Sequence, residues 1–135
     1  MLLQRFPDYG ATLAACNGQT AGSFTENEQE RHGTDHSLIG SLMGRSWGIA
    51  PTVCQAIRLH HDYCSFTDST VPEPVSRLIA MSLIAELAIQ KFARLHGSTE
   101  WDKGAEGAMG ALMLDEQDVD EWVEQLLEGF ALGAA

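Results

Sequence analysis

The chain has 135 residues, of which 19 are acidic and only 8 basic, giving a formal charge of -11 at pH 7. No cluster of Lys or Arg occurs in it, and binding to nucleic-acid phosphates or anionic membranes depends on such clusters. We therefore expect no nucleic-acid and no membrane partner, and the length indicates one domain over residues 1–135.

Cysteine usage and the first residues bear on location. The chain has an odd number of cysteines, Cys16, Cys54 and Cys64, and their spacing is not that of a metal-binding motif. This pattern favours free thiols in a reducing compartment. The opening MLLQRFPDYG lacks the apolar core of a signal peptide, and no run approaches the roughly 18 apolar residues of a membrane span. The predicted location is the cytoplasm.

The first part of the chain is predicted to be helical. Met1–Asn17 is expected to form a helix in two pieces, because Pro7 can begin a helix but not lie inside one. Ser23 and Glu26 form the S-x-x-E pattern of a capping box, which predicts a short helix over Phe24–His32.

The next helix is predicted to begin after Thr34, as N-cap, and to end near Gly48. Asp35 is expected in its first turn, where a carboxylate suits the helix dipole. Gly40 and Gly44 are poor helix formers, so their presence indicates that another helix approaches closely there.

Pro51 is well placed to begin the following helix. There the 3.6-residue repeat puts His60 on the buried face, with His61 about 100° further round. Asp62–Pro74 is rich in Asp, Ser, Thr and Pro and is expected to be a loop.

The second half begins with the longest helical stretch, Val75–His96, which is apolar nearly all round and is therefore predicted to be the central helix. Its single acidic residue is Glu86. Gly97–Gly110 is predicted to be loop with a short helix near 105–112, and Asp115 to cap a last helix with an apolar stripe. The fold class is all-α, with five to six helices.

The candidate site comprises His36, His60 and His61 on two helices and Glu86 on a third. Imidazoles and carboxylates bind divalent transition metals, and helical folds build such sites from side chains that project inward. The alternative is that His60 is a core histidine bonded to a carbonyl, His61 a surface residue, and Glu86 a partner of Lys or water. The residues alone favour this packing interpretation over a metal site.

Several ordered motifs resemble the HDOD domain family. They are E-x-E-x-x-x-x-G-T-D-H-x-x-x-G at Glu26–Gly40, W-G-I-A-P at Trp47–Pro51, Q-A-I-R-L-H-H-D at Gln55–Asp62, I-A-E-L-A at Ile84–Ala88 and L-M-L-D-E-Q-D-V at Leu112–Val119. The resemblance implies an irregular bundle similar to HD and HD-GYP metal phosphohydrolases. It would place His36, His60 and His61 at the later histidine ligands and Glu86 at the relatives' final Asp.

The chain departs from the hydrolase pattern in one respect. The His-Asp pair that defines the relatives would fall before Met1, and no histidine precedes His32. We therefore expect the family's N-terminal helices to be missing and an apolar face to be exposed unless the chain dimerises. A dinuclear centre also needs several carboxylates, so catalysis by this chain is not expected.

Three functional hypotheses follow. The resemblance implies a bacterial regulatory, signal-transduction domain that acts without catalysis through a protein partner or a homodimer. The second hypothesis is a sensor that binds a divalent transition metal or a nucleotide. The third is a metal-dependent phosphohydrolase or phosphodiesterase whose site is incomplete in this chain.

Overall fold

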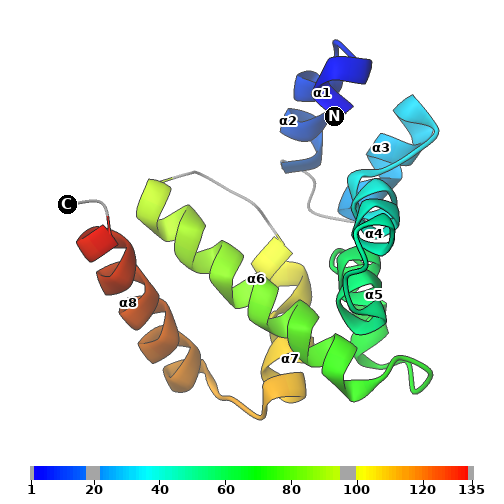
Figure 1. Ribbon diagram of the computed structural model, residues 1–135. Coiled ribbons are helices and arrows are strands. Elements are labelled where there is room, and N and C mark those ends of the chain that lie inside the picture. Colours follow the sequence, from blue (N-terminus) through cyan, green and yellow to red (C-terminus); the bar gives the residue numbers. More distant parts are fainter. Residues whose placement is uncertain (1, 18–21, 95–99, 134–135) are drawn as a thin grey trace.

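The computed structural model describes residues 2–17, 22–94 and 100–133. Within these ranges the chain forms α-helices and one short 3-10 helix, with no strand (Figure 1). In chain order these are α1 (Leu2–Arg5), α2 (Tyr9–Asn17), α3 (Phe24–His32), α4 (His36–Ser46), α5 (Pro51–Leu59), η1 (Tyr63–Phe66), α6 (Glu73–Ala93), α7 (Glu100–Leu112) and α8 (Glu116–Gly133). The all-α class is confirmed, and the eight α-helices of the described residues exceed the five or six expected.

The capping signals place the first three helices as predicted. The chain breaks between α1 and α2 around Pro7. A complete capping box of Ser23 and Glu26 begins α3. Gly33 ends it with φ of 66°, a left-handed conformation that glycine adopts without strain. Helix α2 packs against α3, so the N-terminal segment is tied to the helix that precedes the histidines.

The N-cap of α4 is Asp35 and not Thr34 as predicted. The Asp35 carboxylate accepts a hydrogen bond from the backbone N–H of Leu38 at 2.7 Å, and a charged acceptor at a helix N-terminus also benefits from the dipole. The close approach at the α4 glycines is confirmed. A Cβ at Gly40 would lie 3.0 Å from Cγ2 of Ile57 on α5.

Helix α6 is central, as predicted, and packs against α5, α7 and α8. Figure 1 shows α8 on one side of α6 and the α4–α5 pair on the other. Its buried residues, which form much of the core, are Val75, Ile79, Ala80, Leu83, Ile84 and Ala88. The helix begins at Glu73 rather than Val75 and ends at Ala93, with Arg94 as a left-handed C-cap, before the predicted end at His96; residues 95–99 lie outside the described residues.

Two predicted loops contain helix. Residues 63–66 form η1 inside the expected loop, and α7 begins at Glu100, earlier than the expected short helix. Most of the predicted loop at Gly97–Gly110 is therefore helical within the described residues. A Cβ at Gly104 would lie 2.7 Å from Cδ2 of Leu83 on α6, so this glycine allows two helices to approach closely.

The apolar stripe of α8 meets α6 and α7. Val119 and Val123 are buried in a cluster with Ile84 and Ala88, and Leu126, Leu127 and Phe130 pack partly against it. Asp115 precedes the helix, and its Oδ1 accepts from the backbone N–H of Asp118 at 3.0 Å. The predicted cap and stripe are therefore confirmed.

Large apolar side chains also remain at the surface. Trp47 is 70% exposed, and Ile49 and Val53 are 39% and 36% exposed. Within the described residues, no helix combines the length and apolar character that a membrane crossing requires.

Candidate metal centre

Three histidines meet between α4 and the end of α5. One ring nitrogen of His36, one of His60 and one of His61 all lie within 4.8 Å of one another. The ring centroids are 5.0 Å apart for His36 and His60, 5.0 Å for His36 and His61, and 4.0 Å for His60 and His61.

The end of α5 explains how two adjacent histidines reach one place. The helix ends at Leu59, so His60 is its C-cap and His61 already lies in the following turn. His60 keeps a right-handed helical conformation, with φ of -63° and ψ of -14°, and two neighbours about 100° apart both reach a site that lies between their directions. His61 is only 8% exposed, which contradicts the surface position of the packing interpretation.

Glu28 holds the first imidazole. This carboxylate is fully buried, and its Oε2 lies 2.7 Å from Nδ1 of His36 and 3.1 Å from the His36 backbone nitrogen. Its Oε1 accepts from the hydroxyl of Tyr9. Burial alone would raise the pKa of Glu28, but hydrogen bonds from His36 and Tyr9 outweigh burial and lower the pKa. An ionised Glu28 can only accept, so Nδ1 of His36 carries the proton.

Glu100 holds the second imidazole from α7. Its Oε2 lies 2.8 Å from Nδ1 of His61 and accepts from the hydroxyl of Tyr63 at 2.7 Å. Lys103 donates to Oε1 at 2.8 Å. Burial opposes ionisation of Glu100, but the hydrogen bonds from His61, Lys103 and Tyr63 lower its pKa to about 2. Nδ1 of His61 is therefore also the protonated ring nitrogen.

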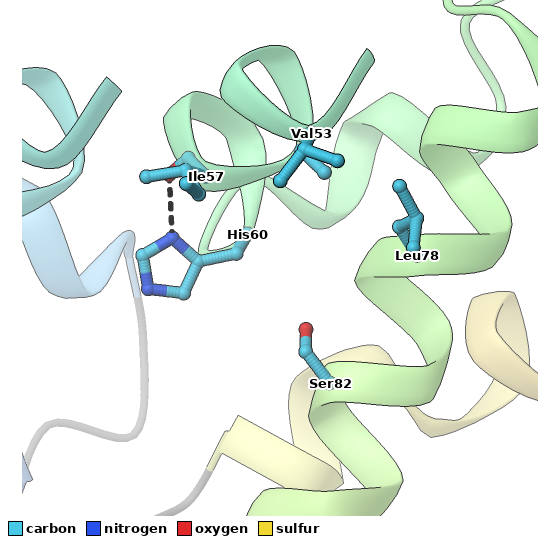
Figure 2. Close-up of a pocket in the computed structure, with 6 residues that line it drawn as sticks. Val53, Ile57, His60, Leu78 and Ser82 are labelled. Atoms are coloured by element: carbon cyan, nitrogen blue, oxygen red, sulfur yellow. Dashed lines mark hydrogen bonds between the residues drawn. The ribbon is translucent and has the colours of Figure 1, made fainter. Parts of the chain in front are cut away.

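A backbone carbonyl holds the third imidazole. Nδ1 of His60 lies 2.8 Å from the carbonyl oxygen of Ile57 (Figure 2). A carbonyl oxygen only accepts, so the proton of the neutral ring is on Nδ1. Burial, followed by the proximity of His61, lowers the pKa of His60 to about 4. The neutral form that can bind a metal therefore predominates at pH 7.

The hydrogen bonds at Nδ1 of the three rings leave the Nε2 atoms available to bind an ion. In the neutral form of each ring, a proton on Nδ1 leaves Nε2 with a lone pair and no hydrogen. Yet Nε2 of His36 and Nε2 of His60 lie 3.1 Å apart. Two lone pairs at this distance repel unless a cation lies between them or one ring gains a proton. Histidine ligands in metal sites characteristically donate the other ring N–H to a carboxylate or carbonyl.

Phe24 on α3 closes one side of the cluster. Its ring stacks on His61, with centroids 4.5 Å apart and an interplanar angle of 11°, and meets His36 edge-on at 5.6 Å. Phe24 is itself buried. This apolar wall fixes the orientation of two imidazoles.

Residues 1–63 match the family model of the HDOD domain. The match confirms the suspected resemblance and includes His36, His60 and His61. It ends before the motifs at Ile84–Ala88 and Leu112–Val119, whose resemblance stays a prediction. No curated protein and no solved structure matches the chain.

Glu86, the fourth predicted ligand, lies outside both the HDOD match and the three-histidine group. It is half-buried on α6, and its Oε1 accepts from Nε2 of Gln90 at 3.0 Å. The carboxylates that contact the histidines are instead Glu28 and Glu100, which the sequence analysis missed.

One of the two missed carboxylates had a signal in the sequence. Glu28 follows Phe24 by four residues, which places both on the same face of α3, and both are buried. Glu100 had no comparable signal, because it lies in Gly97–Gly110, which was predicted to be mainly loop. Both lie beside histidines that are distant in sequence, and Glu100 lies outside the HDOD match.

Proposed function

We propose that this chain is a regulatory module of the HDOD type that binds one divalent transition-metal ion through Nε2 of His36, His60 and His61. The observation that carries the proposal is the convergence of three imidazoles, each with Nδ1 tied to an acceptor. The donor set fits this group of metals, because imidazole nitrogen suits Zn, Cu, Fe and Ni, whereas Mg and Ca prefer oxygen ligands.

A role without catalysis is supported by the composition of the group. Within the described residues it contains no carboxylate, whereas two-metal hydrolysis uses several anionic ligands to hold both ions. The module is proposed to act in the cytoplasm of a bacterium, as one domain over residues 1–135.

Signal transduction through a protein partner or a homodimer is part of the proposal. The exposed apolar side chains Trp47, Ile49 and Val53 lie around the connection from α4 to α5, whereas the histidines lie at the opposite ends of these two helices. Apolar surface of this kind is typical of protein contacts. An ion that links the start of α4 to the end of α5 would fix the helix pair that carries this surface.

The test is metal content after loading with Zn²⁺ and removal of excess ion. The wild type should hold close to one zinc per chain, and the His60→Ala variant should lose it. His32→Ala is the matched control, since this histidine contacts Thr12 at 2.9 Å and does not belong to the cluster. Circular dichroism establishes that both variants are folded. Zinc retained by His60→Ala, or absent from the wild type, would contradict the proposal.

Metal-assisted hydrolysis is a second candidate, favoured by one observation. Three protein nitrogens leave a coordination position open, as in mononuclear catalytic zinc sites, where the ion activates a bound water. Turnover of a chromogenic phosphodiester by the zinc-loaded wild type, lost in His60→Ala, would establish this candidate. Zinc binding without turnover would leave the regulatory function.

A further inference from the structure

One side of α6 is apolar and exposed along most of the helix. Met81, Ile89 and Phe92 are 52%, 51% and 46% exposed. The 3.6-residue repeat groups six residues on this side, here called the α6 face: Leu78, Met81, Ser82, Ala85, Ile89 and Phe92. None of the six is charged. Because a helix that is apolar all round is typically buried on every side, a covering partner is expected on this face.

Charge restricts how a second copy of the chain can approach. Each chain has a net charge of -11, and helix α8 alone carries six acidic residues and no basic one. Like charges that oppose each other across an interface are unfavourable. Helix α6 is balanced, with two acidic and two basic residues, and its charged side chains lie outside the α6 face. Two copies can therefore meet through this face, whereas a basic partner would be attracted to α8.

The order of side chains along the α6 face is the same in both directions. Ala85 is at the middle, Met81 and Ile89 lie four residues to either side of it, and Leu78 and Phe92 lie seven residues to either side. In an antiparallel helix pair with two-fold symmetry, residues at equal distance from the axis meet. Met81 would thus face Ile89 of the partner subunit. The small Ala85 at the axis allows the helices to approach to the usual separation of about 8–10 Å.

A hollow beside the face is shaped to receive a side chain of the partner. It lies between α5 and α6 and has a volume of about 350 Å³. Figure 2 shows Leu78 and Ser82 on its α6 side and Val53 on its α5 side. In the antiparallel pair, position 81 meets position 89 of the second copy. The aliphatic side chain of the partner subunit's Ile89 would therefore lie over this largely aliphatic hollow.

The exposed area fits a dimer that dissociates readily. A half-exposed side chain of this size offers on the order of 100 Å², so Met81, Ile89 and Phe92 offer about 300 Å² per copy and about 600 Å² per pair. The rim of the hollow, where Val53 is 36% exposed, has to contribute for the pair to approach the roughly 1,200 Å² at which stable interfaces begin. We therefore expect a dimer that forms at high protein concentration and separates on dilution.

We propose that two copies of this chain pair through their α6 faces, antiparallel about a two-fold axis at Ala85. The proposal rests on the proposed function in taking a homodimer as its contact, and it does not require the bound ion. It leaves the exposed side chains of the α4–α5 connection available to a different protein.

The first experiment is sedimentation velocity on the full chain over a range of concentrations, in which the wild type should shift from monomer to dimer. Met81→Lys and Ile89→Glu should each raise the Kd of the dimer by up to about 100-fold. Each loses about half the burial of a large apolar side chain, which weakens pairing by up to about tenfold, and the two-fold symmetry places the loss in the interface twice.

The matched controls are Leu42→Lys and Leu42→Glu. Leu42 is 54% exposed on α4, so these variants introduce the same charges at an equally exposed helical position outside the α6 face. Both should dimerise with a Kd close to that of the wild type. Circular dichroism establishes that all four single variants are folded.

The variant that combines Met81→Lys with Ile89→Glu tests the antiparallel register. In the proposed pair, each new lysine lies opposite a new glutamate of the second copy, and opposite charges across an interface are complementary. The combined variant should therefore dimerise at least about tenfold more tightly than either single variant. A different protein on the face would give no such recovery.

A wild type that stays monomeric at every concentration would overturn the proposal and leave the α6 face to a different protein. Equal weakening by the Leu42 variants, an unchanged Kd in Met81→Lys and Ile89→Glu, or no recovery in the combined variant would also overturn it. The zinc content of the same samples tests the metal site separately. A dimer without zinc would contradict metal binding and support the pairing, and a zinc-loaded monomer would do the reverse.

Discussion

Nε2 of His36 lies 3.1 Å from Nε2 of His60, although hydrogen bonds from Nδ1 of each ring leave both Nε2 atoms with a lone pair. A shared cation, or a proton on one of the two Nε2 atoms, removes this repulsion, and a third imidazole, that of His61, is in reach of the same position. The predictions below test the parts of the chain that create this arrangement.

The first prediction concerns the carboxylate behind His36. Glu28→Gln removes the charge that accepts from Nδ1 of His36, so the ring becomes a weaker ligand and is held less firmly. Zinc affinity should fall by about 10- to 100-fold, as is usual when a partner of a metal-bound histidine is changed. Competition with a chromophoric chelator measures this affinity. Glu30→Gln, an exposed change on the same helix, should bind zinc with wild-type affinity; equal losses in both variants would count against the role of Glu28.

Metal binding should also stabilise the fold. The proposed ligands come from the start of α4 and the end of α5, so an ion would link two helices and bind the folded chain far better than the unfolded one. Free Zn²⁺ at a hundredfold excess over Kd adds about 2.7 kcal/mol of stability, which corresponds to a rise in Tm of about 10 °C for a chain of this size. Thermal unfolding followed by circular dichroism measures the rise, and a chelator should reverse it. An unchanged Tm at saturating zinc would disagree with this coupling.

The Glu100 network should contribute to stability. Tyr63→Phe removes the hydroxyl that donates to Oε2 of Glu100 at 2.7 Å, and a hydrogen bond to a charged group contributes about 1.5–3 kcal/mol. Urea denaturation should show a loss of that size. Zinc should still bind, because His61 keeps its own contact with Glu100. A variant as stable as the wild type would mean that water replaces the tyrosine hydroxyl.

Two glycines of α7 should respond in opposite directions to alanine. At Gly104 the added Cβ would meet Leu83 at 2.7 Å and Tyr63 at 2.8 Å, and overpacking of this kind costs about 1–3 kcal/mol. At Gly110 nothing lies within 4 Å of the new Cβ. Gly110→Ala should therefore stabilise the helix by up to about 1 kcal/mol. Chemical denaturation of both variants measures the two changes in stability. If Gly110→Ala also destabilised the chain, close packing would not explain the loss at Gly104.

Local signals in the sequence determined where most helices begin and end. The capping box at Ser23 and Glu26, the proline at Pro51 and the stripe of α8 each act over a few residues, so their physical consequences do not depend on the rest of the chain. The family resemblance was also recognised from short motifs, and the match over residues 1–63 confirms it. Through that resemblance, His36, His60 and His61 were placed in the candidate site from the sequence.

Only the tertiary structure decided what surrounds those histidines. Glu28 and Glu100 contact them across 8 and 39 residues of sequence, and no periodic pattern encodes contacts of that range. His61, which the packing interpretation placed at the surface, is only 8% exposed, because Phe24 and Glu100 from other helices contact its ring. Gly97–Gly110 was predicted to be mainly loop, because a sequence does not reveal that α6 lies within van der Waals contact of Gly104. The protonation of Nδ1 in His36 and His61 follows from those two contacts, whereas that of Nδ1 in His60 follows from the carbonyl of Ile57 three residues earlier.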